Sequence, residues 1–280
     1  MTDDAAPRRL SVPIGEGYLH YEVEGSTVVG DDDVLLDHDD DLLAATPWAE
    51  AGFGIAPFLP DPAMTDLVTG LTDLVAGLIR THVAPVPASF ELARYHDHVR
   101  TDAAHQAVVG ELFRAGIASE ALPIPVATIE ERISELVGCR VSTYNSSYGE
   151  SRVYLRIARP GGRGDHNPPH RDVWLAPLRH GVNGYVPLAG STPRSSLGLV
   201  PGSHRWPESD IVRTREGATL DGIAYAVPAV VGSTRELRLS RPDPAPGEVL
   251  LFSPYLVHGG AINLEPDLTR ASLELRCWRV

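Results

Sequence analysis

Residues 167–178 read NPPHRDVWLAPL, and this stretch decides the fold expected for the chain. His170 and Asp172 lie two positions apart, just ahead of an apolar run. If the run forms a strand, side chains two apart point to the same face. An imidazole and a carboxylate that face inward together are costly to bury unless something binds them. We therefore expect a binding site here, and Trp174, next on that face, either lines the site as a substrate contact or packs in the core.

A second histidine stands in GEVLLFSPYLVHGGAINL, residues 247–264. VLLF is typical of a buried strand, and His258 follows near its end, before two glycines. Two imidazoles and one carboxylate on one face of an octahedron, with three positions open, form the ligand set of non-haem Fe(II) oxygenases. The open positions are needed because a co-substrate and dioxygen must both reach the iron. His170, Asp172 and His258 are therefore the candidate metal ligands and catalytic residues.

Further along, TRASLELRCW places Arg270 and Ser272 on one face of an expected strand. An arginine fork beside a hydroxyl suits a carboxylate held end-on, such as the far carboxylate of 2-oxoglutarate. Tyr154 and Arg156 share a face of another expected strand. They are candidates for contact with the co-substrate or with a substrate carboxylate, and a structural salt bridge is the alternative for Arg156.

On these residues the chain resembles the Fe(II)- and 2-oxoglutarate-dependent dioxygenases, and among them the phytanoyl-CoA dioxygenase-like family. The resemblance covers residues 145–280 and comprises HRD with its apolar run (170–178), GLVPGSHRW (198–206), PGEVLLFSPYLVHGG (246–260) and RAS (270–272). It implies a double-stranded β-helix, a cupin-like jelly roll, with Fe(II) on His170, Asp172 and His258. It also implies 2-oxoglutarate on Arg270, assisted by Ser272, and dioxygen as the second co-substrate. Halogenating relatives replace the carboxylate with a small residue, so Asp172 favours oxygenation.

The rest of the chain is consistent with one domain, 1–280, that is mainly β with helices packed outside. Residues 1–140 are expected to be mostly helical, and residues 141–280 to form the jelly-roll core from short strands broken by Pro and Gly. The expected helices span 61–79, capped by Asp61, then 104–115, and 128–138, which opens on a capping box. Four other segments are a frayed leader (1–10), a strand (17–25), an acidic loop (31–43) and a lid at the barrel mouth (179–196). Residues 207–240 form an insertion.

The composition limits the kinds of partner and chemistry expected for this chain. A net charge of −13 and a pI near 5.2 argue against general affinity for nucleic acid or an anionic membrane. No run approaches the roughly 18 uncharged apolar residues of a membrane span. All 24 basic residues are arginine, which excludes Schiff-base chemistry and a P-loop lysine. We expect a cytoplasmic protein whose two cysteines, Cys139 and Cys277, are free thiols.

The predicted function is oxidation of a C–H bond in a small molecule of bacterial specialised metabolism. The arginines suggest, more weakly, that this substrate is anionic. Hydroxylation is the default outcome, and desaturation or ring closure follow the same first step. Two alternatives stay open: a cupin-like metal enzyme that does not use 2-oxoglutarate, and a non-catalytic jelly roll that binds a ligand. The sequence leaves the substrate and the oligomeric state open.

Overall fold

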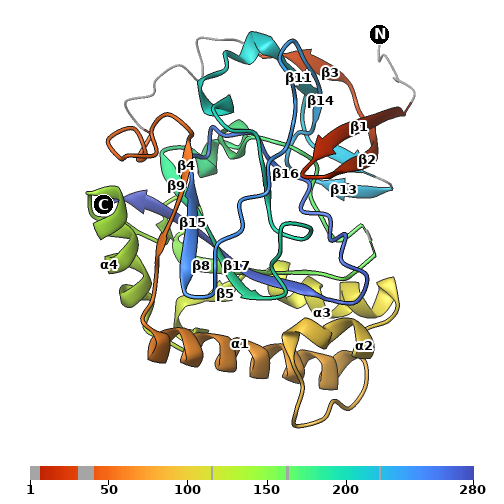
Figure 1. Ribbon diagram of the computed structural model, residues 1–280, viewed down its shortest axis with the longest axis vertical. Helices are drawn as coiled ribbons and strands as arrows, with labels where there is room; N and C mark the ends of the chain where they lie inside the picture. Colours follow the sequence, from red (N-terminus) through yellow and green to blue (C-terminus); the bar gives the residue numbers. More distant parts are fainter. Residues whose placement is uncertain (1–6, 31–40, 115, 162–163, 221) are drawn as a thin grey trace.

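The computed structural model describes residues 7–30, 41–114, 116–161, 164–220 and 222–280. Its centre is an eight-stranded antiparallel sheet in which the strands nearest the site run in the order β4-β15-β9-β17-β8-β5 (Figure 1). These strands are β4 (Phe53–Pro57), β5 (Ile117–Ala118), β8 (Glu150–Ala158), β9 (Gly181–Ala189), β15 (Glu248–Phe252) and β17 (Arg270–Arg279). β6 (Val141–Ser142) pairs with β17 and β7 (Tyr144–Asn145) with β8.

A second, smaller layer is built from short pieces of chain. β10 (Gly198–Leu199) pairs with β16 (His258–Gly259), His170 bridges His258, and Leu199 bridges Ser240. Along the sequence these pieces alternate with β8, β9, β15 and β17 of the main sheet. This alternation between two facing layers is the double-stranded β-helix, so the predicted jelly-roll fold is confirmed.

The two faces of the main sheet have different neighbours because side chains alternate along each strand. Val153, Leu155, Leu273 and Leu275 point outward into the largest apolar cluster, which they share with the helices. Polar side chains of the same strands point inward, toward the smaller layer. The helices that cover the outer face are α1 (Asp61–His82), α2 (Tyr95–His98), α3 (Asp102–Arg114) and α4 (Val126–Val137) (Figure 1).

α1 confirms the predicted helical stripe. Met64, Leu67, Leu71, Val75 and Ile79 are buried along one side of it. By length and composition, α1 is the one helix in the described ranges that could also cross a membrane. A core helix of a soluble protein passes the same test, and the α1 stripe packs into the cluster beneath the sheet.

The predicted helix starts are wrong in detail. Asp61 does not cap α1: the N-cap is Pro60, without a side-chain hydrogen bond. α4 follows Pro125 in the same way and begins ahead of the predicted capping box. A proline has its φ fixed near the helical value, so it can precede a first turn without a polar cap. α4 ends at Gly138, whose φ of 72° is the left-handed conformation that glycine favours.

The N-terminal part contains more strand than predicted. The expected strand is confirmed as β2 (Gly17–Glu24), with Leu19, Tyr21 and Val23 buried. The leader prediction is wrong for residues 8–10, because β1 (Arg8–Ile14) pairs with β2 along its whole length. β3 (Thr27–Val29) and β4 were not predicted. Residues 1–6, and 31–40 of the acidic loop, lie outside the described residues.

The predicted lid is also wrong. Residues 181–189 form β9, a central strand between β15 and β17. The glycines and the proline of this segment are typical of a loop. Gly184 instead lies where the side chains of Leu275 and Val249 approach the backbone of the strand closely. The 207–240 insertion contains β11 (Ile211–Thr214), β12 (Ala218–Leu220), β13 (Ile223–Tyr225) and β14 (Val230–Ser233), which pair among themselves and with β2 and β3.

Candidate active site

The HRD segment reaches the site by a different route from the predicted strand. Only His170 pairs in strand fashion: its N–H donates to the carbonyl of His258 (2.8 Å), and the N–H of His258 donates back (2.9 Å). The chain then turns into two 3₁₀ helices, Asp172–Trp174 and Ala176–Leu178, so the prediction of a strand over 170–178 is wrong. The prolines on both sides of this segment cannot donate to a sheet, which disfavours a continuous strand.

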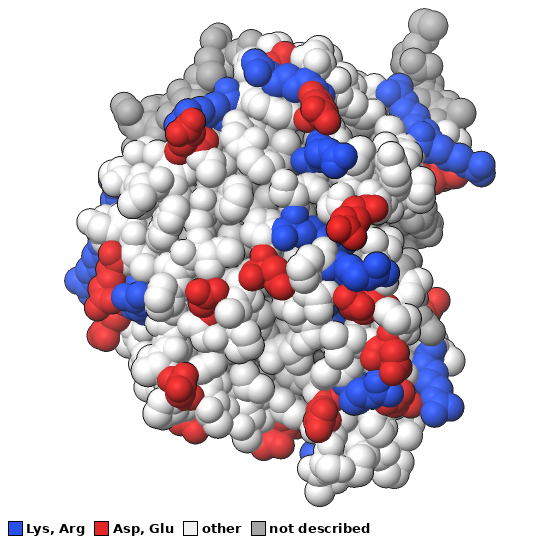
Figure 2. Space-filling view, viewed as in Figure 1, with Lys and Arg blue, Asp and Glu red and all other residues white. Residues whose placement is uncertain are grey.

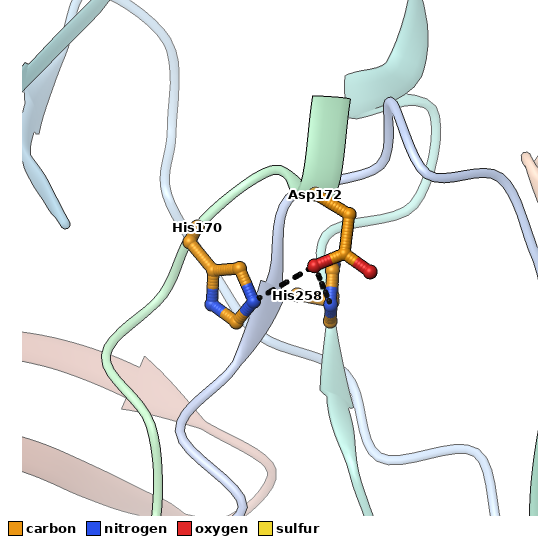
Figure 3. Close-up of side chains that lie close together, drawn as sticks. All are labelled: His170, Asp172 and His258. Atoms are coloured by element: carbon orange, nitrogen blue, oxygen red, sulfur yellow. Dashed lines mark ion pairs between the residues drawn. The ribbon is translucent and has the colours of Figure 1, made fainter. Parts of the chain in front are cut away.

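The structure nevertheless brings the three predicted side chains together (Figure 3). Nε2 of His170 lies 3.3 Å from Oδ1 of Asp172, and Nε2 of His258 lies 3.7 Å from the same oxygen. All three residues are buried, and one ligand atom from each lies within 4.8 Å of the others. A cluster of two imidazole nitrogens and one carboxylate oxygen at this spacing has the composition and size of a metal site.

Hydrogen bonds to the backbone set the tautomer of both histidines. Nδ1 of His170 donates to the carbonyl of Pro168 (2.7 Å), and Nδ1 of His258 donates to that of Leu256 (2.9 Å). A carbonyl can only accept, so each Nδ1 carries the hydrogen and each Nε2 presents its lone pair to the cluster. This is the arrangement that orients metal-binding histidines.

The protonation states agree with this arrangement. Burial, and secondly His170, lowers the pKa of His258 to about 4, which favours its neutral form. Burial would raise the pKa of Asp172, but the Arg276 guanidinium and the two imidazoles hold it well below its usual range. At neutral pH the cluster therefore offers a neutral His258 and an ionised carboxylate, as metal ligation requires.

Asp172 is also held from the side opposite the histidines. Its Oδ2 accepts hydrogen bonds from Nδ2 of Asn183 (3.0 Å) and from Nε of Arg276 (3.1 Å). Neither contact with Asp172 was predicted, and Asn183 fell in the predicted lid. The polar alternation in RASLELR did show that Arg276 shares a face with Arg270.

His170 and His258 of the cluster line a cavity that opens to solvent and, counted together with its open mouth, encloses about 560 Å³ of empty space. Arg270 lines the same cavity and is only 2% exposed. Its Nη1 donates to Oγ of Ser272 (2.9 Å), and its buried Nε has no hydrogen-bond partner. No ion pair joins Arg270 to a carboxylate among the described residues. A buried cation without a counter-ion is costly, so this end of the cavity suits a bound anion.

The other predicted contact residues, Arg156, Tyr154 and Trp174, have different surroundings. Arg156 lines the cavity and also forms the alternative salt bridge, with its Nε 3.0 Å from Oε2 of Glu274. The guanidinium of Arg276 lies over the ring of Tyr154, with Cζ of Arg276 5.4 Å from the ring centroid. Trp174 does not share the inward face of Asp172, because the 3₁₀ helix turns it away, and its Nε1 donates to Glu208 (2.9 Å).

His166 and His204, outside the triad, are also buried. His166 lies in the cavity wall. His204 braces a turn, with its Nε2 3.0 Å from the carbonyl oxygen of Ala49.

The family model of phytanoyl-CoA dioxygenase matches residues 84–271, which is more than half of the chain. The chain belongs to the phytanoyl-CoA dioxygenase family. It is therefore an Fe(II)- and 2-oxoglutarate-dependent oxygenase, as the sequence predicted, with iron, 2-oxoglutarate and dioxygen as its cofactors. The donor set fits the iron, and the unpartnered Nε of Arg270 fits an anionic co-substrate.

Solved structures similar to this chain include the following three. EctD from S. alaskensis, solved with 2-oxoglutarate and 5-hydroxyectoine, is 17% identical (TM-score 0.48; 99% of this chain and 84% of that chain). AviO1 from Streptomyces viridochromogenes Tue57 is 17% identical (0.46; 82% and 90%). The epimerase SnoN, in complex with Fe³⁺, alpha ketoglutarate and nogalamycin RO, is 14% identical (0.47; 85% and 82%). No protein with a curated description matches the sequence.

A buried ion pair behind the cluster connects two motifs of the family. Arg171, between His170 and Asp172, pairs through Nη1 with Oε1 of Glu208 and donates through Nη2 to the carbonyls of Ser203 and Trp206. Arg171 and Glu208 are both almost fully buried. These contacts fix the HRD segment to the PGSHRW turn. Beyond His170 they take the place of strand pairing, which the segment lacks from Asp172 onward.

Gly259 fixes the other side of the cluster and gives the first testable prediction. Its φ is 126°, and a Cβ here would lie 2.5 Å from the carbonyl oxygen of Pro168, which holds His170. We expect Gly259→Ala to lower the free energy of unfolding by about 1–3 kcal/mol. It should also weaken Mn(II) binding, because His170 must shift; thermal unfolding and metal titration measure the two effects.

The control is Gly77→Ala, in the middle of α1, where a Cβ would meet nothing within 4 Å. This change should stabilise the protein by about 0.5–1 kcal/mol, because alanine favours the helix. Equal melting temperatures for Gly259→Ala and the unaltered protein would contradict the account of Gly259.

Proposed function

We propose that Nε2 of His170, Nε2 of His258 and Oδ1 of Asp172 bind Fe(II), and that Arg270, assisted by Ser272, binds the far carboxylate of 2-oxoglutarate. The protein then oxidises a C–H bond of a small molecule, with hydroxylation as the default outcome. One observation carries this proposal: three suitable buried donors meet beside a cavity that their two histidines line, and the same cavity is lined by an arginine that has no carboxylate partner among the described residues.

In this proposal the protein contributes geometry and electrostatics. Pro168 and Leu256 orient the two imidazoles through their carbonyls, and Ser272 orients the guanidinium of Arg270. Phe252 packs beside His258, with ring centroids 4.8 Å apart, and keeps this side of the cluster apolar. When bound, Fe(II) with 2-oxoglutarate supplies dioxygen activation and C–H oxidation, which no side chain can supply.

The cavity wall supports a small polar substrate. Apart from the triad and Arg270, its polar lining includes Arg156, His166, Asn167 and Glu274. Burial would raise the pKa of Glu274, but the guanidiniums of Arg156 and Arg276 hold it below its usual range, so it is ionised. A long alkyl chain would desolvate these groups without pairing them, whereas a polar or anionic molecule can bond to them.

We infer that the enzyme works in the cytoplasm, in bacterial specialised metabolism, without nucleic-acid or membrane partners. The net charge of −13 supports the absence of nucleic-acid and anionic-membrane partners. On the face drawn in Figure 2, basic and acidic side chains lie interspersed, as on an ordinary solvated surface.

The substitution Arg270→Met tests the co-substrate site. Removing one partner of a buried charge pair costs about 2–5 kcal/mol, so 2-oxoglutarate should bind roughly 30- to 3,000-fold more weakly. Mn(II) affinity should stay close to that of the unaltered protein, because Arg270 contacts none of the triad. Calorimetric titration with Mn(II), and then with 2-oxoglutarate on the Mn(II)-loaded protein, measures both constants.

The control is Arg194→Met, which removes an arginine whose side chain is 58% exposed. It should bind 2-oxoglutarate as the unaltered protein does. If Arg270→Met retains full affinity, the anchor lies elsewhere. If the unaltered protein binds Mn(II) but no 2-oxoglutarate, the chain is a cupin-like metal protein of another kind.

A further inference from the structure

We propose that Asn183 and Arg276 are positioning residues that hold Asp172 so that it offers a single oxygen to the metal. This inference rests on the proposed metal binding by His170, Asp172 and His258. It assigns the two residues a role in keeping the third open position of the iron available.

The two oxygens of Asp172 have separate partners. Oδ1 faces Nε2 of His170 and of His258, at 3.3 and 3.7 Å. Oδ2 points the other way and accepts from Nδ2 of Asn183 and Nε of Arg276, at 3.0 and 3.1 Å. Two donors on one oxygen leave little capacity for a metal on it, because a carboxylate oxygen has about two acceptor sites.

The donors lie on central strands of the main sheet, whereas Asp172 lies outside that sheet. Asn183 on β9 and Arg276 on β17 are direct register partners in the main sheet, so their side chains lie side by side on its inner face. Asp172 begins a 3₁₀ helix with no strand neighbour of its own. The two hydrogen bonds therefore tie a metal-binding residue on a loop to the middle of the sheet.

Arg276 is itself fixed in place. The ring of Tyr154 packs against its guanidinium, and its Nε is bonded to Asp172. Its guanidinium is charged, because arginine is not deprotonated in proteins. A charged donor gives a stronger hydrogen bond than a neutral one, which favours retention of this contact when the metal is bound.

The chemistry needs this restraint. A carboxylate can bind a metal through one oxygen or both, and the second oxygen would occupy one more position. Two histidines and one carboxylate oxygen leave three positions of an octahedron. If Fe(II) were bound here, these positions would have to be available to 2-oxoglutarate and dioxygen. With Oδ2 held by the sheet, Asp172 takes one position only.

The test measures Mn(II) affinity without oxygen or turnover. Asn183→Leu removes one donor at similar volume and without any change of charge. Arg276→Lys keeps the positive charge near the metal, so that altered repulsion cannot explain a change, but it loses the Nε donor. We expect each variant to bind Mn(II) about 10- to 100-fold more weakly, as for other residues that orient metal ligands.

The matched control is Arg279→Lys, the same substitution at an exposed position of the same strand, which should leave the affinity unchanged. Far-ultraviolet circular dichroism shows whether each variant is folded. If Asn183→Leu does not fold, the Mn(II) affinity of Arg276→Lys tests the positioning role. The visible spectrum of the Co(II)-loaded variants should also change, because Asp172 becomes free to bind through both oxygens.

The outcomes separate this inference from the proposed function. If Mn(II) binding depends on Asp172 but is unchanged in both variants, with an unchanged Co(II) spectrum, the positioning role is overturned and the metal site stands. If the unaltered protein binds no Mn(II), or binds it equally with Asp172→Asn, the proposed metal site fails first.

Discussion

Replacing Asp172 with asparagine should reduce succinate formation from 2-oxoglutarate to background and weaken Mn(II) binding by more than about 100-fold. The lower bound follows because loss of a residue that merely orients a ligand already costs 10- to 100-fold. Asparagine keeps the shape of the side chain but removes the negative charge from the group whose Oδ1 lies 3.3 and 3.7 Å from the two imidazoles. Calorimetric titration and a succinate assay measure the two effects.

Asp165→Asn is the matched control for this variant. Asp165 is another buried carboxylate in the cavity wall, but it pairs with Arg159 (2.8 Å) and His105 (3.4 Å), away from the triad. This variant should lose stability and keep its Mn(II) affinity. Equal loss of metal binding in both variants would show that the effect arises from general disruption of the cavity.

The second large effect is expected from Glu208→Ala. This change leaves the almost fully buried guanidinium of Arg171 without its carboxylate, which typically costs about 3–5 kcal/mol. It also removes the acceptor for Nε1 of Trp174. For a chain of this size the melting temperature should fall by roughly 10 °C. Metal binding should weaken as well, since Arg171 lies between two of the proposed metal ligands.

Two comparisons test the explanation. Glu22→Ala breaks the exposed pair with Arg9 and should change stability by less than about 1 kcal/mol. Arg171→Met combined with Glu208→Leu should recover part of the stability lost in Glu208→Ala, because no buried charge is left alone. If Glu208→Ala melts like Glu22→Ala, the pair does not fix the HRD segment.

The candidate triad and Arg270 could be proposed from the sequence because each stands in a local pattern with a chemical meaning. His170 and Asp172 flank one residue, His258 precedes two glycines after an apolar run, and RASLELR alternates polar and apolar residues along one strand. Such patterns survive without knowledge of the fold, because the side-chain period of a strand is fixed.

The supports of the site could not be predicted, because they depend on contacts between distant segments. Asn183 lies on β9, where Gly181, Gly184 and Pro187 resemble a loop until the neighbouring strands are known. Glu208 is remote in sequence from Arg171 and meets it only in the folded chain. The 3₁₀ turn at Asp172 was likewise read as a strand, because the following apolar residues suit either conformation.

The most direct test of the central claim is a crystal structure of the protein with Mn(II) and 2-oxoglutarate. We predict Mn(II) bound to Nε2 of His170, Nε2 of His258 and one oxygen of Asp172, with the far carboxylate of 2-oxoglutarate on Arg270. The result that would contradict the account is a metal ion elsewhere, for example at the surface cluster of His96, Asp97 and Asp267, with the triad left without metal.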